Sequence, residues 1–197
     1  MEVLMHKSEI KKLGKKEPDV ITKTIIAWHA GSSYHGDLPS LSIFKRIIST
    51  KHPIASVRAP EIMNTKSETE FQWSVELTGT RLFHVGIATT LQRSKEHICK
   101  YDFEAIYYSS GGYVCDGRKT IQVSDKNHED RSGDVISFKF QPQSKKLYVQ
   151  LSSLGINDHS PRSFTVKDNI NYFPFVQLIG IYAREVKLIA PVFKNKK

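Results

Sequence analysis

Cysteine is scarce in this chain of 197 residues, which has only Cys99 and Cys115 and no CxxC pair of the kind that holds zinc or a redox disulfide. Two thiols in dissimilar contexts do not make a disulfide framework, and reduced thiols fit a cytoplasmic or nuclear protein. We therefore expect no structural disulfide. Cys115 lies in a predicted strand, and we interpret it as a buried free thiol.

Long apolar segments are absent as well. No run approaches the roughly 18 consecutive apolar residues that cross a bilayer. The first residues have neither the basic region nor the continuous apolar stretch of a secretion signal. We expect an intracellular protein without transmembrane insertion.

The sequence lacks the motifs of the common enzyme classes. It has no Gly-rich phosphate loop, no GxSxG and no HExxH. His97 and Cys99 share one face of an extended segment, but nothing nearby completes a metal site or a nucleophile with its base. The polar stretch 124–133 lacks the spacing of a calcium loop, so we interpret it as a solvated loop. We expect no catalysis, no cofactor and no metal.

Helical periodicity is confined to 38–49, where Leu41, Phe44, Ile47 and Ile48 are spaced as on one face of a helix. This spacing predicts a single helix. From residue 19 onward the chain otherwise consists of short apolar or alternating runs separated by turn signals. Predicted strands cover 71–77, 82–88, 104–109, 112–115, 119–123, 134–141, 146–152, 163–167, 173–178 and 186–193.

The succession of these runs predicts the fold class. The very short connection between 71–77 and 82–88 predicts a hairpin. In the runs 134–141 and 146–152, apolar residues alternate with polar ones on either side of a four-residue turn. This pattern predicts a second hairpin. Many short strands with turns about every eight to twelve residues indicate an all-β fold, a two-sheet antiparallel sandwich with little helix.

Basic residues outnumber acidic ones, 29 Lys and Arg against 20 Asp and Glu, which gives a formal net charge of +9. The length suits one sandwich domain over 19–193, with a basic arm at 1–18 and a basic tail at 194–197. We interpret the arm as solvated, with a short docking helix as the alternative. Part of the excess charge lies in the arm and the tail.

The remaining basic residues are scattered along the chain. Nucleic-acid binding requires basic residues gathered on one face, ideally with exposed aromatics between them. Nucleic acid is therefore not favoured as a partner. A basic sandwich that binds nucleic acid or anionic lipid through scattered Lys, Arg and the tails is the alternative function. An enzyme acting on carbohydrate ranks last, because only a general likeness between sandwich folds suggests it.

Six blocks of sequence occur in an order that resembles the SPRY domain family. They are FQWSVEL at 71–77, HVGIAT at 84–89, YYSSGGYVCDGRK at 107–119, GDVISFKF at 133–140, KKLYVQL at 145–151 and YFPFVQL at 172–178. Each block alone is a weak signal, whereas their order over 55–190 is more specific. The resemblance implies two antiparallel sheets packed face to face as in concanavalin-like folds. It also implies a peptide-binding surface of loops at one end.

The resemblance also assigns candidate ligand-binding residues. In peptide-binding members an Arg-x-Pro segment forms one wall of the site, and Arg58 and Pro60 stand in that place. The opposite wall comes from the segment that in this chain holds Lys100, Tyr101, Glu104, Ala105, Ile106 and Tyr107. Ala105 stands where the family has tryptophan. The resemblance implies a non-catalytic adaptor, within assemblies such as ubiquitin ligases or chromatin-modifying complexes.

The chemistry of these residues suits a short acidic or phosphorylated peptide. The guanidinium of Arg58 offers a planar fork of donors to a carboxylate or phosphate. The alternative to ligand binding is that Arg58 is a surface-loop arginine paired with Glu61, and both interpretations stay open. Tyr107 and Tyr108 are adjacent, so a strand would direct them to opposite faces and only one could contact a ligand. The alternative for either tyrosine is ordinary core packing.

Overall fold

The computed structural model describes residues 22–24, 40–42, 47–50, 54–59, 62–78, 82–89, 104–117, 119–124, 129–153, 160–179 and 184–189. These ranges contain fifteen strands and no helix. The strands are β1 (Thr22–Thr24), β2 (Ser40–Ser42), β3 (Ile47–Thr50), β4 (Ile54–Arg58), β5 (Met63–Asn64), β6 (Glu70–Thr78), β7 (Phe83–Ala88), β8 (Ile106–Ser109), β9 (Tyr113–Asp116), β10 (Lys119–Gln122), β11 (Val135–Gln141), β12 (Lys146–Ser152), β13 (Arg162–Thr165), β14 (Asn171–Ile179) and β15 (Arg184–Ile189).

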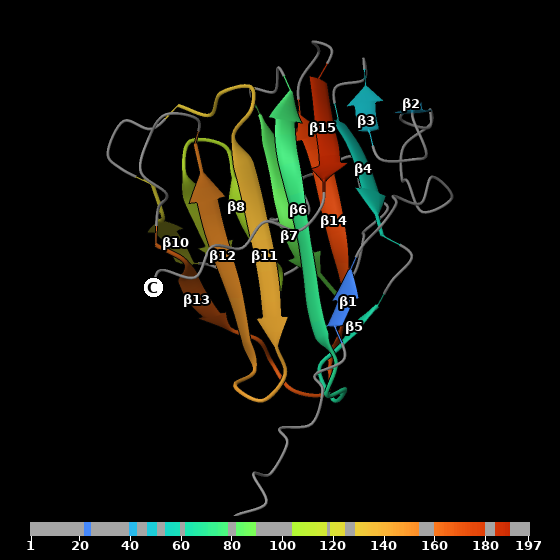
Figure 1. Cartoon of the computed structure of the whole chain (residues 1–197), viewed down its shortest axis with the longest axis vertical. Coiled ribbons are helices and arrows are strands. Elements are labelled where there is room, and N and C mark those ends of the chain that lie inside the picture. The colour runs from blue at the N-terminus through green and yellow to red at the C-terminus, as the bar shows by residue number, and fades with distance from the viewer. Residues whose placement is uncertain are drawn as a thin grey trace, which may run out of the picture.

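The strands form two sheets that lie face to face (Figure 1). The eight-stranded sheet has the order β13-β12-β11-β6-β15-β3-β2, and β1 pairs in parallel with β6. The seven-stranded sheet has the order β10-β9-β8-β7-β14-β4, and β5 pairs with β14. All pairings except that of β1 are antiparallel. The prediction of an all-β sandwich is therefore confirmed.

The core lies between the sheets and follows from the alternation of apolar residues along the strands. In the eight-stranded sheet Trp73 pairs with Phe138, and the two rings stack with centroids 4.7 Å apart. From the other sheet Phe83 and Tyr108 face inward with ring centroids 5.8 Å apart. All four side chains are at most 1% exposed. Because a strand has a period of two, burying this face turns every second residue outward.

The predicted hairpin of 134–141 and 146–152 is confirmed as β11 and β12. The hairpin predicted for 71–77 and 82–88 is wrong, because β6 and β7 belong to different sheets. Both strands carry an apolar face toward the same core, one from each side. Alternation predicts that a strand has a buried face, but it does not tell which sheet the strand joins.

The helix predicted within 38–49 is also wrong, because this part of the chain contributes β2 and β3. β3 pairs with β15, so that Ile48 lies opposite Val186, and β2 pairs with β3. Ile47 and Ile48 are β-branched and favour a strand when a partner strand is available. Long-range pairing with β15 therefore overrides a short local helical spacing.

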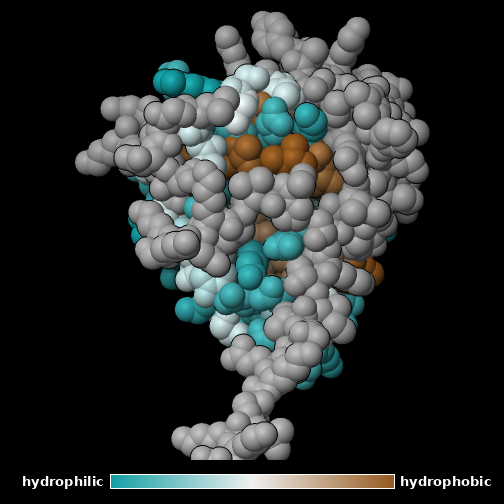
Figure 2. All heavy atoms as spheres, in the orientation of Figure 1, coloured by the Kyte–Doolittle hydropathy of each residue, from teal (hydrophilic) through white to brown (hydrophobic). Residues whose placement is uncertain are grey.

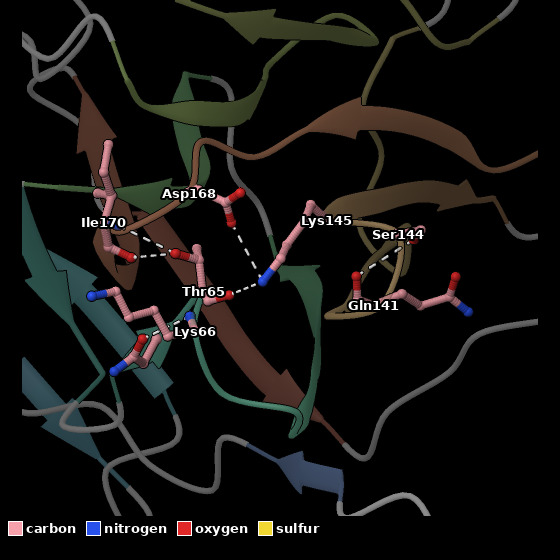
Figure 3. Close-up of polar contacts among 8 residues, drawn as sticks. Thr65, Lys66, Gln141, Ser144, Lys145, Asp168 and Ile170 are labelled. Carbon is pink, nitrogen blue, oxygen red and sulfur yellow. Dashed lines mark hydrogen bonds and ion pairs between the residues drawn. The ribbon is translucent and has the colours of Figure 1, made fainter.

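One end of the sandwich is held together by contacts among three turns (Figure 3). The backbone amide of Ile170 donates to the hydroxyl of Thr65 at 3.2 Å, and that hydroxyl donates to the Ile170 carbonyl at 3.1 Å. The ammonium group of Lys145 donates to the Thr65 carbonyl and lies 3.4 Å from a carboxylate oxygen of Asp168. These contacts join the turn after β5, the β11–β12 turn and the β13–β14 connection. They fix the end of the sandwich at which β4 ends and β8 begins.

The predicted arm at 1–18, the tail at 194–197, and His97 and Cys99 lie outside the described residues. Within the described ranges no helix is long and apolar enough to cross a membrane.

Candidate functional site

The side of the seven-stranded sheet that faces away from the core, called the outer face below, carries a row of residues across five strands. In this row Arg58 of β4 pairs with Phe175 of β14, which pairs with Gly86 of β7. Gly86 pairs in turn with Tyr107 of β8, and Tyr107 with Cys115 of β9. Paired residues in a sheet point to the same side. The register therefore places Arg58 and Tyr107 on one face, although 48 positions separate them in sequence.

Gly86 determines how this row packs. Its two neighbours in the row, Tyr107 and Phe175, lie on strands about 9.6 Å apart, two inter-strand spacings. Their ring centroids are nevertheless only 6.2 Å apart in an edge-to-face arrangement. The absence of a side chain at Gly86 lets the two rings approach each other. With Ala88 and Ala105 they form a second apolar cluster, separate from the main core.

Arg58 ends β4 beside this cluster. Its guanidinium carbon lies 4.5 Å from the ring centroid of Phe173, a cation–π contact. The Nε atom of Arg58 is buried and has no hydrogen-bond partner. No ion pair joins the guanidinium to a carboxylate of the described residues. Arg58 is thus a strand residue rather than a loop residue, and the alternative partner Glu61 lies outside the described ranges.

A polar row lies next to Arg58 on the outer face. Ser56 of β4 pairs with Gln177 of β14, which pairs with His84 of β7. The side-chain amide nitrogen of Gln177 donates to the Ser56 hydroxyl at 3.0 Å, whereas its Oε1 has no partner. Gln177 is 1% exposed. Sequence reasoning missed this residue, whose signal is a single amide within the otherwise apolar run FPFVQLI at 173–179.

The remaining predicted site residues occupy different environments. Ala105 and Tyr107 lie on the outer face and are at most 5% exposed. Ile106 faces the inter-sheet core and is 2% exposed, because it alternates with those two residues along the strand. Glu104 precedes β8 and forms an ion pair of 2.5 Å with Lys167. Pro60, Lys100 and Tyr101 lie outside the described residues.

The expectation that Tyr107 and Tyr108 face opposite sides is confirmed. Tyr107 belongs to the outer cluster, and Tyr108 lies in the main core. Its hydroxyl donates to Asp130 at 2.6 Å, and the second oxygen of Asp130 accepts the amide of Gly111. Asp130 therefore anchors the β8–β9 turn, which corrects the interpretation of 124–133 as merely solvated. Within the described ranges no three His, Cys, Asp or Glu side chains gather as metal ligands.

The charged groups around the outer face lie at its β4 edge and at its β8–β9 edge. Arg58 supplies a positive charge at β4. At the other edge, burial raises the pKa of Asp116, Lys119 lowers it and Glu104 raises it. Asp116 pairs with Ile106, whose side chain faces the core, and Glu104 forms an ion pair with Lys167. These two carboxylates therefore do not give the outer face an acidic side, whereas Arg58 favours an anionic group at β4.

The buried Tyr108 predicts a pH dependence of stability. Burial, with the carboxylates of Asp130 and Asp134 adding to it, raises the pKa of Tyr108 well above its usual range. The native state then keeps a proton that the unfolded chain releases at about pH 10. The stabilisation is fully present below that pH and is lost as the pH rises further.

We therefore expect unfolding free energy to fall more steeply above about pH 10 in wild type than in Tyr108→Phe, as measured by urea unfolding at several pH values. Tyr108→Phe is less stable at neutral pH because its contact with Asp130 is lost, so the slope with pH is the quantity to compare. The exposed Tyr113→Phe is the control. Equal slopes in wild type and Tyr108→Phe would contradict the expectation.

Among the residues that Figure 2 colours, an apolar patch lies near the upper part of β6, and polar residues lie above and below it. Val135 and Ile189 are outward-facing apolar residues of the eight-stranded sheet. Lys139 lies 3.2 Å from Glu70, and Lys187 lies 3.7 Å from Glu76. These two lysines are paired with glutamates, so they do not form part of a basic stripe.

Comparison with known proteins identifies the fold. No family model and no curated protein matches the sequence. The SPRY domain of human HERC1 is similar in structure, with a TM-score of 0.64 at 12% identity over 85% of this chain and 100% of that one. The TRIM65 PSpry domain has a TM-score of 0.64 at 11% identity over 86% and 94% of the two chains. Stonustoxin has a TM-score of 0.62 at 11% identity over 86% of this chain and 27% of its own. The two-sheet sandwich of this chain is therefore the fold of a SPRY domain.

Proposed function

We propose that this protein is a non-catalytic interaction module, an adaptor that binds a short acidic or phosphorylated segment of a partner protein. The segment binds on the Arg58 side of the outer face. The observation that carries the proposal is the guanidinium of Arg58, which lies against Phe173 and has no carboxylate partner among the described residues. SPRY domains are among the known structures that have this fold.

The surroundings of Arg58 suit an anionic ligand. The ring of Phe173 covers one side of the guanidinium and holds its plane, which prepares its donors for a carboxylate or phosphate. Hydrogen bonds between charged groups are about twice as strong as those between neutral groups. An arginine that is already ordered also loses less conformational entropy when it binds.

The position of Arg58 at the end of β4 gives the ligand an orientation. The acidic group of the ligand lies over β4 and β14, next to Arg58. Tyr107 is 5% exposed and Phe175 is 0% exposed, so these two rings support the site from beneath and offer little surface to the ligand.

A peptide library tests this proposal. We expect wild type to retain acetylated, amidated hexapeptides that contain one Asp, Glu or phosphoserine. Arg58→Ala should weaken their binding by about tenfold or more, which corresponds to the loss of one hydrogen-bonded charge pair. Arg58→Lys should lose part of the affinity, because an ammonium group lacks the planar fork. Fluorescence anisotropy with labelled peptides provides the measurement.

Arg162→Ala is the matched control, because Arg162 is an exposed arginine on β13 of the other sheet. It should bind the peptides as wild type does. Retention of no peptide, or equal affinities for wild type and Arg58→Ala, would refute the proposal. A DNA duplex and anionic vesicles belong in the same experiment. Binding to either that declines steeply with salt would support the alternative function.

A further inference from the structure

We infer that Gln177 is a second determinant of binding and contacts the main chain of an extended peptide segment. This inference rests on the proposed function and specifies the form of its ligand. Gln177 lies on the outer face and is 1% exposed. One hydrogen bond, from its amide nitrogen to the Ser56 hydroxyl, is made at 3.0 Å. Its Oε1 is buried without a partner.

One atom of the Gln177 side-chain amide lacks a hydrogen-bond partner in either orientation of the amide. The oxygen and nitrogen of a glutamine side chain exchange places when the amide is turned over. Ser56 can serve as acceptor or as donor, so either orientation satisfies one amide atom and leaves the other without its bond. Buried polar groups are normally hydrogen-bonded, and an exception calls for a ligand or another partner.

Arg58 and Gln177 lie close enough to contact one short segment. Arg58 pairs with Phe175, and Gln177 follows two residues later on β14, so the two are diagonal neighbours on the sheet. Such neighbours are separated by about 7–8 Å. Two residues of an extended chain span about 6.6 Å. A side-chain carboxylate at Arg58 therefore places a peptide group of the same segment near Gln177.

A peptide backbone is the chemistry that satisfies both residues. It offers an N–H to the Gln177 oxygen and a carbonyl to the amide nitrogen if the amide is turned over. A phosphate diester offers acceptors only, so it could serve Arg58 and the amide nitrogen of a turned-over Gln177, whereas a peptide group serves Gln177 in either orientation. Phe175 is 0% exposed, so the segment must displace the atoms that cover Gln177 and Phe175 in this structure.

The test uses the hexapeptide that wild type retains most strongly. The double variant Ser56→Ala with Gln177→Met replaces both polar partners by apolar groups, and we expect it to fold with an unchanged or higher Tm. Its affinity for the peptide should fall about fivefold or more, in line with the loss of one hydrogen bond. Gln150→Met is the control, because Gln150 is 2% exposed and lies on the other sheet.

Ester substitution locates the contact. Replacing each peptide bond of the ligand in turn by an ester removes the N–H and weakens the carbonyl. One position should lose affinity in wild type and lose little in the double variant. If the double variant binds as tightly as wild type, or every ester has the same effect on both proteins, this inference is wrong. If Arg58→Ala still loses affinity in that case, the proposed function stands without it.

Discussion

Replacing Gly86 by alanine is expected to destabilise the protein by about 3 kcal/mol or more and to leave little folded chain. An added Cβ at this position would overlap the carbonyl oxygen of Ile106 and lie 2.5 Å from the Cα of Tyr107. Both atoms belong to the backbone of β8 and cannot move aside as the end of a flexible side chain can. Relief requires separation of two adjacent strands in the middle of the sheet.

Urea unfolding followed by circular dichroism measures this effect, with Ser163→Ala on the exposed side of β13 as the control. The control should unfold within about 0.5 kcal/mol of wild type. If Gly86→Ala were as stable as wild type, the close approach of β7 and β8 would be incorrect. The packing of Tyr107 against Phe175 over Gly86 would then also need revision.

Trp73→Ala is expected to cost about 3–5 kcal/mol, the usual range for removing a large aromatic side chain from a core. Trp73 is 0% exposed in β6, stacks on Phe138 at 4.7 Å and lies edge-on to Phe71 at 6.2 Å. No neighbouring side chain can fill the volume without leaving its own place in the core. Unfolding in urea, monitored by circular dichroism, gives the difference in free energy.

Trp73→Phe separates the contribution of the aromatic ring contact from that of the indole N–H. The indole Nε1 of Trp73 is buried without a hydrogen-bond partner, so its removal relieves an unsatisfied donor. We expect Trp73→Phe to cost about 1–2 kcal/mol, well below the alanine variant, because the ring contact with Phe138 is largely kept. A phenylalanine variant as unstable as Trp73→Ala would indicate that Nε1 has a partner.

The sequence predicted strands best where alternation is clean and the turn is short. β11 and β12 show this, because Ile136, Phe138 and Phe140 alternate with polar residues and the strands pair across a short turn. The length of the turn alone does not decide the pairing, since an equally short connection joins β6 to β7 in the other sheet. The prediction failed for β2 and β3, where local spacing resembled a helix. The pairing of β3 with β15 depends on residues more than a hundred positions away, and local spacing carries no information about such a partner.

The candidate site was predicted in part. The resemblance to SPRY domains directed attention to Arg58 and to 104–107, and the register places Arg58, Ala105 and Tyr107 on one face. Ile106 faces the core instead, and we leave it out of the proposed surface. Gln177 was missed, since a lone amide in an apolar strand becomes notable only when its neighbours are known.

The sequence by itself determined that this protein is a β-sandwich and which side of most strands is buried, because alternation with a period of two is a local property of the chain. The tertiary structure decided which strands share a sheet and therefore which side chains share its outer face. It brought Arg58, Phe175, Gly86 and Tyr107 into one row through pairings between distant strands. Such pairings minimise the free energy of the whole core, and no single segment contains the information that specifies them.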